Sequence, residues 1–366
     1  MGVRVILTTG GTGGHIFPAL AVAEQLRREG AELLFVGSQY GSEAKLAKQA
    51  GLEFRGLPVR GVLGRGLRSV GALWGLFRAV SMAGAIVKGF RPDAVIGFGA
   101  YASFPSLVAG RLSGVPIAVH EQNAMPGVTN KILARFVKKV FLGYREAEKY
   151  FTGKSRKIYT GNPIRSEILS NKRSEAVKFF GLDPEKQTIL VSGGSRGAQS
   201  INKAMLYVEQ ALSGRHDVQV LHATGEANYE EYIKELNKKG PVEDNIVVKP
   251  YLHDMPMALA AADLAVFRAG AIGLAELTAK GVPSVLIPYP YATANHQEFN
   301  ARAVEAAGAA KVILDKELTG EKLLEEIEHL LIRSEDLQKM KKAAKSLGRP
   351  GAAKEIAQQA LQLVKN

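Results

Sequence analysis

The chain has 366 residues, of which 46% are hydrophobic and 23% are charged. That length predicts two domains, each large enough for a hydrophobic core of its own. The sequence contains no cysteine, so disulfides, thiolate metal sites and a cysteine nucleophile are excluded. We expect no signal peptide, because the sequence enters a predicted strand almost at once.

The net charge of +13 is carried by the N-terminal half of the chain. Residues 1–162 contain 22 Lys and Arg against 9 Asp and Glu, whereas the remaining residues contain 26 of each kind. No acidic residue occurs between Glu53 and Asp93, and the basic residues there are Arg55, Arg60, Arg65, Arg68, Arg78, Lys88 and Arg91. Such a face is typical of proteins that bind a polyanion or an anionic membrane, and a merely basic surface is the alternative.

Strands and helices are predicted to alternate along the first half, which favours a parallel, doubly wound sheet. The predicted strands are residues 3–8, 32–36, 94–97, 117–119 and 139–141. The predicted helices are residues 18–29, 42–49, 70–88, 105–112 and 128–136. The apolar segment 70–87 is short for a membrane span and carries Arg78 near its centre, so we interpret it as a core or interfacial helix.

The second half repeats this alternation after a break. Gly161 and the Asn-Pro pair that follows it interrupt regular structure, so residues 160–165 are predicted to cross between two domains. The predicted strands beyond the crossing are residues 188–191, 218–222, 246–249, 264–267, 284–287 and 310–313. After Gly351 the sequence predicts a final amphipathic helix.

Two glycine-rich loops each follow a predicted strand and precede a helix, at residues 10–15 and 193–198. Glycines let the backbone approach an anion, and a helix N-terminus offers unpaired N–H groups to it. Neither loop is a dinucleotide fingerprint, since Ile16 stands where the first would need its third glycine. A P-loop ending in Gly153-Lys154-Ser155 is excluded because Glu148 occupies the place of its first glycine. His15 marks the first loop as a candidate site.

Further motifs accompany the two loops. They are Gly-Phe-Gly-Ala-Tyr-Ala-Ser-Phe-Pro at 97–105, His-Glu-Gln-Asn at 120–123, Gly-Asn-Pro-Ile-Arg at 161–165, Arg-Ala-Gly-Ala at 268–271 with Glu276, and His-Gln at 296–297 before Asn300. In this order, over nearly the full chain, they closely resemble the MurG family. Its members are UDP-N-acetylglucosamine:undecaprenyl-pyrophosphoryl-MurNAc-pentapeptide N-acetylglucosaminyltransferases of peptidoglycan synthesis.

The resemblance implies the α/β GT-B fold, in which two Rossmann-like, doubly wound parallel-sheet domains face each other across a cleft. It implies an acceptor and membrane-associated domain of residues 1–162 with about 346–366, and a UDP-GlcNAc-binding domain of residues 163–345. The implied reaction moves GlcNAc from UDP-GlcNAc to the 4-hydroxyl of MurNAc in lipid I, forming lipid II with inversion. We expect no cofactor, no metal and no nucleic-acid partner. We expect a peripheral protein on the cytoplasmic face of the cell membrane.

The resemblance also implies roles for individual residues. The implied donor-binding residues are Thr12, Gly13, Gly14, Asn123, Arg165, Ser195, Leu252, Arg268, Ala271, Ile272, Gly273, Leu274, Ala275, Glu276 and Gln297. Among them Ser195 matches a diphosphate contact, Glu276 a ribose contact, and Leu252 a position whose backbone meets uracil. The implied acceptor-binding residues are Tyr101, His120 and Gln122.

Inverting transfer needs a base for the attacking hydroxyl, and a positioned base contributes about 10²–10⁴-fold. His15 is the candidate because of its place where the glycine loop enters a helix, while Glu121 and His120 are rivals. The chain departs from the commonest family pattern at Ala100, Ala269 and Gly273. The hydroxyl contact that a threonine would make at position 273 is therefore absent.

The basic, apolar segment is predicted to dock on an anionic membrane. The residues we expect there are Arg65, Leu67, Arg68, Trp74, Phe77, Arg78 and Lys88. The alternative is that Trp74 and Phe77 belong to the core. Other functions that fit the same fold are a UDP-GlcNAc 2-epimerase and another glycolipid glycosyltransferase. A nucleic-acid binder is disfavoured because no aromatic–basic RNA motif occurs.

Overall fold

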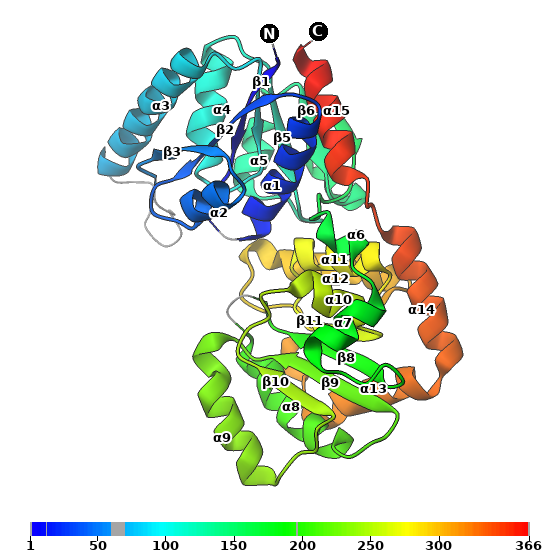
Figure 1. Cartoon of the computed structure of the whole chain (residues 1–366). Coiled ribbons are helices and arrows are strands. Elements are labelled where there is room, and N and C mark those ends of the chain that lie inside the picture. The colour runs from blue at the N-terminus through cyan, green and yellow to red at the C-terminus, as the bar shows by residue number, and fades with distance from the viewer. Residues whose placement is uncertain (1, 12, 60–69, 195–196, 365–366) are drawn as a thin grey trace. The chain divides into compact units, whose positions relative to one another are not determined.

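The computed structural model describes residues 2–11, 13–59, 70–194 and 197–364 (Figure 1). The chain divides into two compact units, which we call unit 1 (residues 1–165 and 349–366) and unit 2 (residues 166–348). Each unit is built on one parallel sheet flanked by helices. The predicted fold class of two doubly wound α/β domains is therefore confirmed.

Unit 1 contains a seven-stranded sheet in the order β3-β2-β1-β4-β5-β6-β7. The strands are β1 (Arg4–Thr8), β2 (Glu32–Ser38), β3 (Glu53–Leu57), β4 (Ala94–Gly97), β5 (Ile117–Glu121), β6 (Lys139–Leu142) and β7 (Arg156–Tyr159). All neighbouring strands are parallel; for example, Ile6 of β1 pairs with Leu34 of β2 on one side and Val95 of β4 on the other. The two edge strands, β3 and β7, are absent from the sequence prediction.

Helices cover both faces of this sheet, because successive residues of each strand point to opposite sides. Val5 and Leu7 pack in one cluster with α1 and α15, whereas Ile6 packs in another with α3 and α4. The helices are α1 (Gly13–Arg28), α2 (Glu43–Gln49), α3 (Val70–Phe90), α4 (Ser103–Leu112), α5 (Val128–Leu133), the 3-10 helix η1 (Arg145–Tyr150) and α15 (Ala352–Val364).

Helix α1 begins at Gly13, five residues before the predicted start at Pro18. Gly13 and Gly14 have low helix propensity, so these positions carry no helical signal. The earlier start matters because it places His15 in the first turn of the helix.

Unit 2 contains a six-stranded parallel sheet in the order β10-β9-β8-β11-β12-β13. Its strands are β8 (Gln187–Ser192), β9 (Val218–Ala223), β10 (Ile246–Lys249), β11 (Leu264–Phe267), β12 (Ser284–Leu286) and β13 (Ala310–Val312). Its helices are α6 (Glu167–Ser170), α7 (Arg173–Phe180), α8 (Gln199–Leu212), η2 (Glu226–Asn228), α9 (Tyr229–Lys239), α10 (Met255–Ala261), α11 (Ala271–Lys280), η3 (Thr293–Asn295), α12 (His296–Ala306), η4 (Asp315–Glu317), α13 (Gly320–Ile332) and α14 (Ser334–Leu347).

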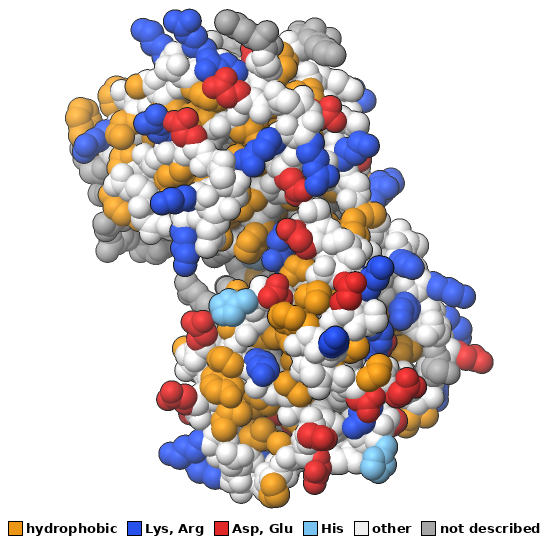
Figure 2. Space-filling view, viewed as in Figure 1, with side chains coloured by type: hydrophobic (Ala, Val, Ile, Leu, Met, Phe, Trp, Pro, Cys, Tyr) orange, Lys and Arg blue, Asp and Glu red, His pale blue; other side chains and the backbone are white. Residues whose placement is uncertain are grey.

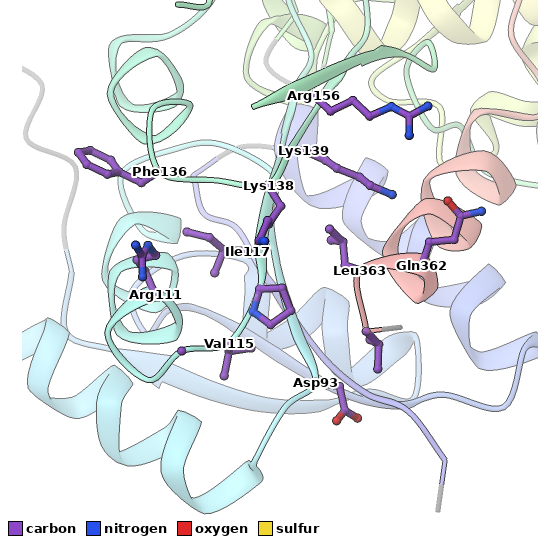
Figure 3. Close-up of a pocket in the computed structure, with 13 residues that line it drawn as sticks. Asp93, Arg111, Val115, Ile117, Phe136, Lys138, Lys139, Arg156, Gln362 and Leu363 are labelled. Carbon is purple, nitrogen blue, oxygen red and sulfur yellow. The ribbon is translucent and has the colours of Figure 1, made fainter. Parts of the chain in front are cut away.

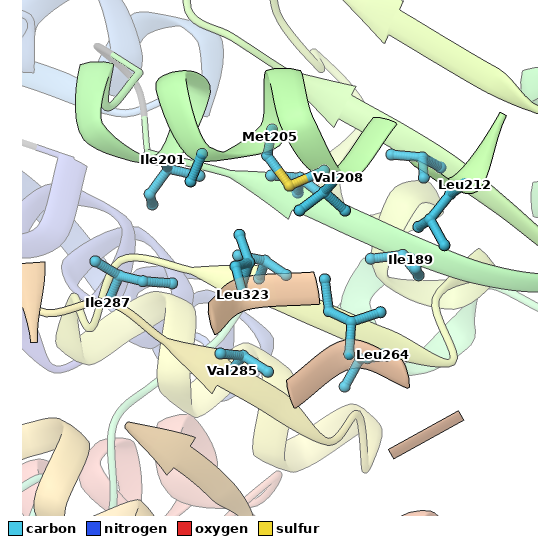
Figure 4. Packing of buried hydrophobic residues seen from close by; sticks show 14 of the residues in the cluster. Ile189, Ile201, Met205, Val208, Leu212, Leu264, Val285, Ile287 and Leu323 are labelled. Carbon is cyan, nitrogen blue, oxygen red and sulfur yellow. The ribbon is translucent and has the colours of Figure 1, made fainter. Parts of the chain in front are cut away.

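Figure 4 shows the core on one face of this sheet. Met205 and Val208 of α8 face Ile189 of β8 and Leu323 of α13, and all four side chains are buried. The apolar residues of α8 recur at helical spacing, which gives that helix one wholly buried side.

In both units the strand order reverses at one point, between β1 and β4 and between β8 and β11. In doubly wound sheets, ligands bind outside the carboxyl ends of the strands at such a point. The first glycine loop follows β1, and the second follows β8. Each loop therefore stands at the switch point of its own sheet.

Candidate functional site

His15 lies beside the carboxyl end of β5. Its Nδ1 is 3.1 Å from Oε1 of Gln122, the first residue after that strand, and the ring is half-buried. Gly99 makes this approach possible, because a Cβ at that position would lie 3.2 Å from His15 Nδ1. The backbone of Gly99 also has a φ of +79°, which side chains disfavour. The structure thus brings together three segments that the sequence singled out separately.

A buried carboxylate shapes the first glycine loop. The N–H of Gly11 donates to Oε1 of Glu43, 2.9 Å away, and Glu43 is fully buried at the start of α2. Glu43 was not among the predicted site residues, because a charged residue in a short amphipathic helix is usually exposed. Thr12, which the resemblance placed at the donor, lies outside the described residues.

Glu121 ends β5 and is 2% exposed. Its carboxylate accepts hydrogen bonds from N and Nδ2 of Asn123, from N of Gly127 and from Nδ2 of Asn130, at 2.8–3.2 Å. Burial raises the pKa of Glu121, while these donors act in the opposite direction. Both oxygens thus hold the loop between β5 and α5, and Asn130 is a further residue that the sequence analysis did not single out.

The motifs at 120–123 and 161–165 are joined to each other inside unit 1. His120 Nε2 lies 3.3 Å from the carbonyl oxygen of Gly161, and Asn162 Nδ2 donates to the carbonyl oxygen of Gln122 at 3.0 Å. A Cβ at Gly143 would lie 2.4 Å from Asn162 Oδ1, so the side chain fits only against glycine there. The motif at 161–165 therefore also holds the end of β5 in place.

His120 is fully buried, and this burial lowers its pKa to about 4. An unfolded histidine titrates near 6.5, so between those values the unfolded chain binds more protons than the folded one. We expect His120 to disfavour the folded state progressively as the pH falls from about 6.5 to about 4; the raised pKa of Glu121 acts in the opposite direction. A histidine NMR titration measures this directly, and a midpoint near 6.5 for His120 would contradict it.

Two other implied site residues of unit 1 are Arg165 and Tyr101. The Arg165 guanidinium lies over the ring of Phe17, 5.0 Å from the ring centroid. Phe17 belongs to α1, the helix that also carries His15. Tyr101 is half-buried in the turn after β4. Next to it, Ala100 adopts a φ of +61°, at the position where the family commonly has glycine.

The second glycine loop is built tightly around its glycines. At Gly197, with a φ of +71°, a Cβ would lie 2.0 Å from the carbonyl oxygen of Thr224. At Gly193 it would lie 2.3 Å from the amide nitrogen of Ala198. The loop leads into α8, a 14-residue helix, as expected of an anion-binding turn. Ser195 lies outside the described residues.

Arg268 has several hydrogen-bond partners at the carboxyl edge of the sheet of unit 2. It donates to Asp315 Oδ1 at 2.5 Å and to Ser200 Oγ at 2.8 Å, and its guanidinium lies over the Tyr289 ring. Gln297 accepts from the backbone N–H of Tyr289 at 3.0 Å. Arg268 and Gln297, which the resemblance implies as residues that bind the sugar donor, therefore both contact Tyr289.

The segment 271–276 forms the first turns of α11, directly after β11. Glu276 is 5% exposed, Ala271, Ile272 and Leu274 are buried, and Gly273 and Ala275 are half-buried. A Cβ at Gly273 would meet its nearest neighbour at 3.9 Å, so the missing threonine side chain would find room. Leu252 is buried in the turn after β10.

Helix α3 presents a mixed apolar and basic surface. Trp74 and Phe77 are 68% and 65% exposed, and their rings stack with centroids 5.9 Å apart. Arg78 and Lys88 are exposed as well, whereas small residues such as Ala79 and Ala83 face the core. The alternative that Trp74 and Phe77 belong to the core is therefore wrong. Figure 2 shows hydrophobic and basic side chains together over this helix.

Three of the expected membrane residues, Arg65, Leu67 and Arg68, lie outside the described residues. Of the helices in the described ranges, none has the length and apolar character that a bilayer crossing requires. The same part of the chain holds no cluster of three or more His, Asp or Glu side chains placed to bind a metal ion.

A pocket of about 710 Å³ in unit 1 lies away from these residues (Figure 3). Ile117, Lys139 and Arg156, the first residues of β5, β6 and β7, line it together with Leu363 of α15. It is therefore at the amino edge of the sheet, opposite to the glycine loop, and we do not assign it to the reacting site.

Two family models match the chain. The glycosyltransferase family 28 N-terminal domain matches residues 5–142, and the glycosyltransferase family 28 C-terminal domain matches residues 188–356. A curated protein from Desulforamulus reducens is 45% identical over 360 residues, covering 97% of both chains. That relative is named UDP-N-acetylglucosamine--N-acetylmuramyl-(pentapeptide) pyrophosphoryl-undecaprenol N-acetylglucosamine transferase.

Solved structures agree with this match. The crystal structure of Acinetobacter baumannii MurG has a TM-score of 0.79 and 29% identity, and the match covers 98% of this chain and 99% of that one. A UDP-GlcNAc 2-epimerase from Neisseria meningitidis has a TM-score of 0.71 at 13% identity, covering 98% of this chain and all of that one. The second likeness shows a common fold alone.

Proposed function

This chain belongs to glycosyltransferase family 28, and we propose that it transfers GlcNAc from UDP-GlcNAc to the 4-hydroxyl of MurNAc in lipid I. The hydroxyl oxygen attacks the anomeric carbon, the bond from that carbon to the diphosphate breaks, and UDP leaves as lipid II forms. The observation that carries the proposal is 45% identity, over nearly its whole length, to a relative named for this transfer.

The donor is assigned to unit 2. The first backbone N–H groups of α11, and those of α8 after the glycine loop, have no carbonyl partner within their own helix, which suits a diphosphate. Glu276 would accept hydrogen bonds from the ribose, and Leu252 would lie against uracil. Arg165, on unit 1, would balance negative charge on the departing UDP.

We assign the base to His15 rather than to its two rivals. His120 is fully buried, so it does not reach substrate, and its pKa of about 4 makes it a weak proton acceptor at neutral pH. Glu121 uses both oxygens to hold its own loop. His15 alone of the three is only half-buried, and it stands at the edge where such sheets bind ligands.

The acceptor's lipid anchor requires a membrane-facing surface, and we assign this role to the exposed side of α3. The protein would then be peripheral, on the cytoplasmic face of the membrane. The stacked Trp74 and Phe77 would enter the interface, while Arg78 and Lys88 would face anionic head groups. Basic residues near such a surface contribute about 1 kcal/mol each.

Replacing Trp74 by alanine is expected to weaken binding to phosphatidylglycerol vesicles roughly 10- to 100-fold, because burying such a side chain contributes about 1.5–3 kcal/mol. Co-sedimentation across a lipid series measures the change. Ile332, an exposed apolar residue of unit 2, supplies the matched control, Ile332→Ala, which should bind like the wild type. Equal binding by the Trp74 variant and the control would overturn the assignment.

The decisive experiment for the function combines the purified protein with UDP-GlcNAc and lipid I. We expect lipid II and UDP in equal amounts. The epimerase alternative, which shares the fold, predicts the ManNAc epimer from UDP-GlcNAc without any acceptor, either still attached to UDP or released with UDP as free ManNAc by hydrolysis. Product from a diacylglycerol acceptor in place of lipid I would instead indicate another glycolipid glycosyltransferase.

A further inference from the structure

A single backbone carbonyl fixes the orientation of the Gln122 amide. Gln122 Nε2 lies 2.8 Å from the carbonyl oxygen of Phe98. That oxygen can only accept, so the amide nitrogen must face it; the reversed amide would place two oxygens in contact. Gln122 Oε1 then faces Nδ1 of His15, at 3.1 Å.

The second hydrogen of the same amide determines which ring nitrogen of His120 carries a hydrogen. Gln122 Nε2 is 3.1 Å from His120 Nδ1, and an amide nitrogen donates but does not accept. His120 Nδ1 therefore carries a lone pair, and the ring hydrogen is on Nε2. That nitrogen faces the carbonyl oxygen of Gly161 at 3.3 Å, which accepts it. In the series of hydrogen bonds that joins Gly161, His120 and Gln122, the donor and the acceptor of each bond are therefore fixed.

The same logic reaches His15. An amide oxygen only accepts, so His15 Nδ1 must carry the hydrogen of its contact with Gln122 Oε1. In a neutral imidazole the lone pair then lies on Nε2. We infer that Gln122 is a positioning residue, which holds His15 as the Nδ1–H tautomer and so makes Nε2 the nitrogen that accepts a proton.

The burial of Gln122 fits this role. Its side chain is 2% exposed, and its amide nitrogen is satisfied by Phe98 and His120. Gly99 packs against the His15–Gln122 contact from the other side: a Cβ there would lie 3.2 Å from His15 Nδ1 and 3.3 Å from Gln122 Oε1. Position 122, which the sequence suggested as an acceptor contact, is thus enclosed by its own unit.

A neutral amide has a consequence that a carboxylate would not have. Once His15 has taken the proton from the attacking hydroxyl, the imidazolium keeps its Nδ1–H bond to Gln122 Oε1. A carboxylate at position 122 would favour the charged imidazolium of His15 before the reaction. Nε2 would then already carry a hydrogen and could not accept the proton of the hydroxyl. Gln122 orients the ring without that effect. This consequence rests on the proposed function, whereas the tautomer does not.

The test reads the tautomer by long-range ¹H–¹⁵N NMR of the full chain at about pH 8, where an ordinary histidine is neutral. His15→Ala assigns the signals. The wild type is expected to show His15 protonated at Nδ1. Gln122→Met, which cannot accept this bond, is expected to shift His15 toward the Nε2–H form. Gln122→Glu, which retains an acceptor oxygen, should keep the Nδ1–H form.

Kinetics provide the second readout. Gln122→Met should lower kcat about 10- to 100-fold, as removing the partner of a functional histidine commonly does, with little change in KM for UDP-GlcNAc. Gln219→Met is the matched control, since Gln219 is a buried, hydrogen-bonded glutamine of unit 2, and it should leave both readouts unchanged.

A wild-type His15 protonated at Nε2 would overturn the inference without any variant. So would an unchanged tautomer in a folded Gln122→Met protein. Failure to form lipid II would count against the proposed function alone, because the NMR readout needs no substrate.

Discussion

Replacing His15 by alanine is expected to lower kcat for lipid II formation by about 10²–10⁴-fold, the contribution of a positioned general base. The imidazole stands in the first turn of α1 at the carboxyl edge of the sheet, held by Gln122. Alanine is also a better helix former than histidine, so the fold of α1 should persist. The measurement is the initial rate with UDP-GlcNAc and lipid I both saturating.

His216→Ala is the control for this loss. His216 is exposed just before β9, at the amino edge of the other sheet, and its removal should leave the rate unchanged. A His15→Ala rate within tenfold of the wild type would reject His15 as the base. Because Glu121 uses both oxygens for its own loop, we do not expect it to take over.

The central strands and the fold class were predictable because their sequence signal is physical and local. β1, β4 and β11 are buried on both faces, so they are continuous apolar runs bounded by turns. The edge strands β3 and β7 were missed because each has only one neighbouring strand and contains charged residues, such as Arg55 and Arg156, in place of a continuous apolar run.

The site was predictable at the level of residues but not of contacts. The motif at 120–123 indicates a strand end. Its amino-acid sequence does not predict that the Glu121 side chain contacts its own loop while the Gln122 side chain contacts His15. Those directions follow from strand alternation combined with partners far along the chain, such as Asn130, Phe98 and Gly161. The exposure of Trp74 depends similarly on which side of α3 meets the sheet.

A buried network in unit 2 carries the largest stability prediction. Glu209 of α8 and His222 of β9 are both fully buried, with Glu209 Oε1 2.7 Å from His222 Nδ1. Tyr232 donates to the other oxygen at 2.7 Å, and burial followed by the Glu209 charge raises the pKa of Tyr232. Asn202 Nδ2 donates to the carbonyl oxygen of Thr224, which turns its Oδ1 toward His222 Nε2.

Both ring nitrogens of His222 thus face acceptor oxygens, Glu209 Oε1 and Asn202 Oδ1. Glu209→Ala is expected to lower the free energy of unfolding of unit 2 by about 3–5 kcal/mol, because His222 and Tyr232 both lose their shared buried partner. In a unit of this size that corresponds to a fall in Tm of roughly 6–20 °C. Thermal unfolding followed by circular dichroism or calorimetry measures it.

Two further variants provide unfolding free energies with which the loss in Glu209→Ala can be compared. Tyr232→Phe leaves one oxygen of Glu209 unsatisfied and should cost about 1–3 kcal/mol. Glu231→Ala removes an exposed carboxylate at the start of α9 and should change stability by less than about 0.5 kcal/mol. A Glu209→Ala protein as stable as Glu231→Ala would show that the network contributes nothing.

The same network bears on the donor loop. The carbonyl oxygen of Thr224, which Asn202 holds, is the atom that leaves room only for glycine at position 197. If unit 2 is the donor domain, loosening this contact lets the loop before α8 shift away from the diphosphate. Glu209→Ala should then raise KM for UDP-GlcNAc at temperatures where unit 2 remains folded, while KM for lipid I stays unchanged. Equal increases in both KM values would indicate global loosening instead.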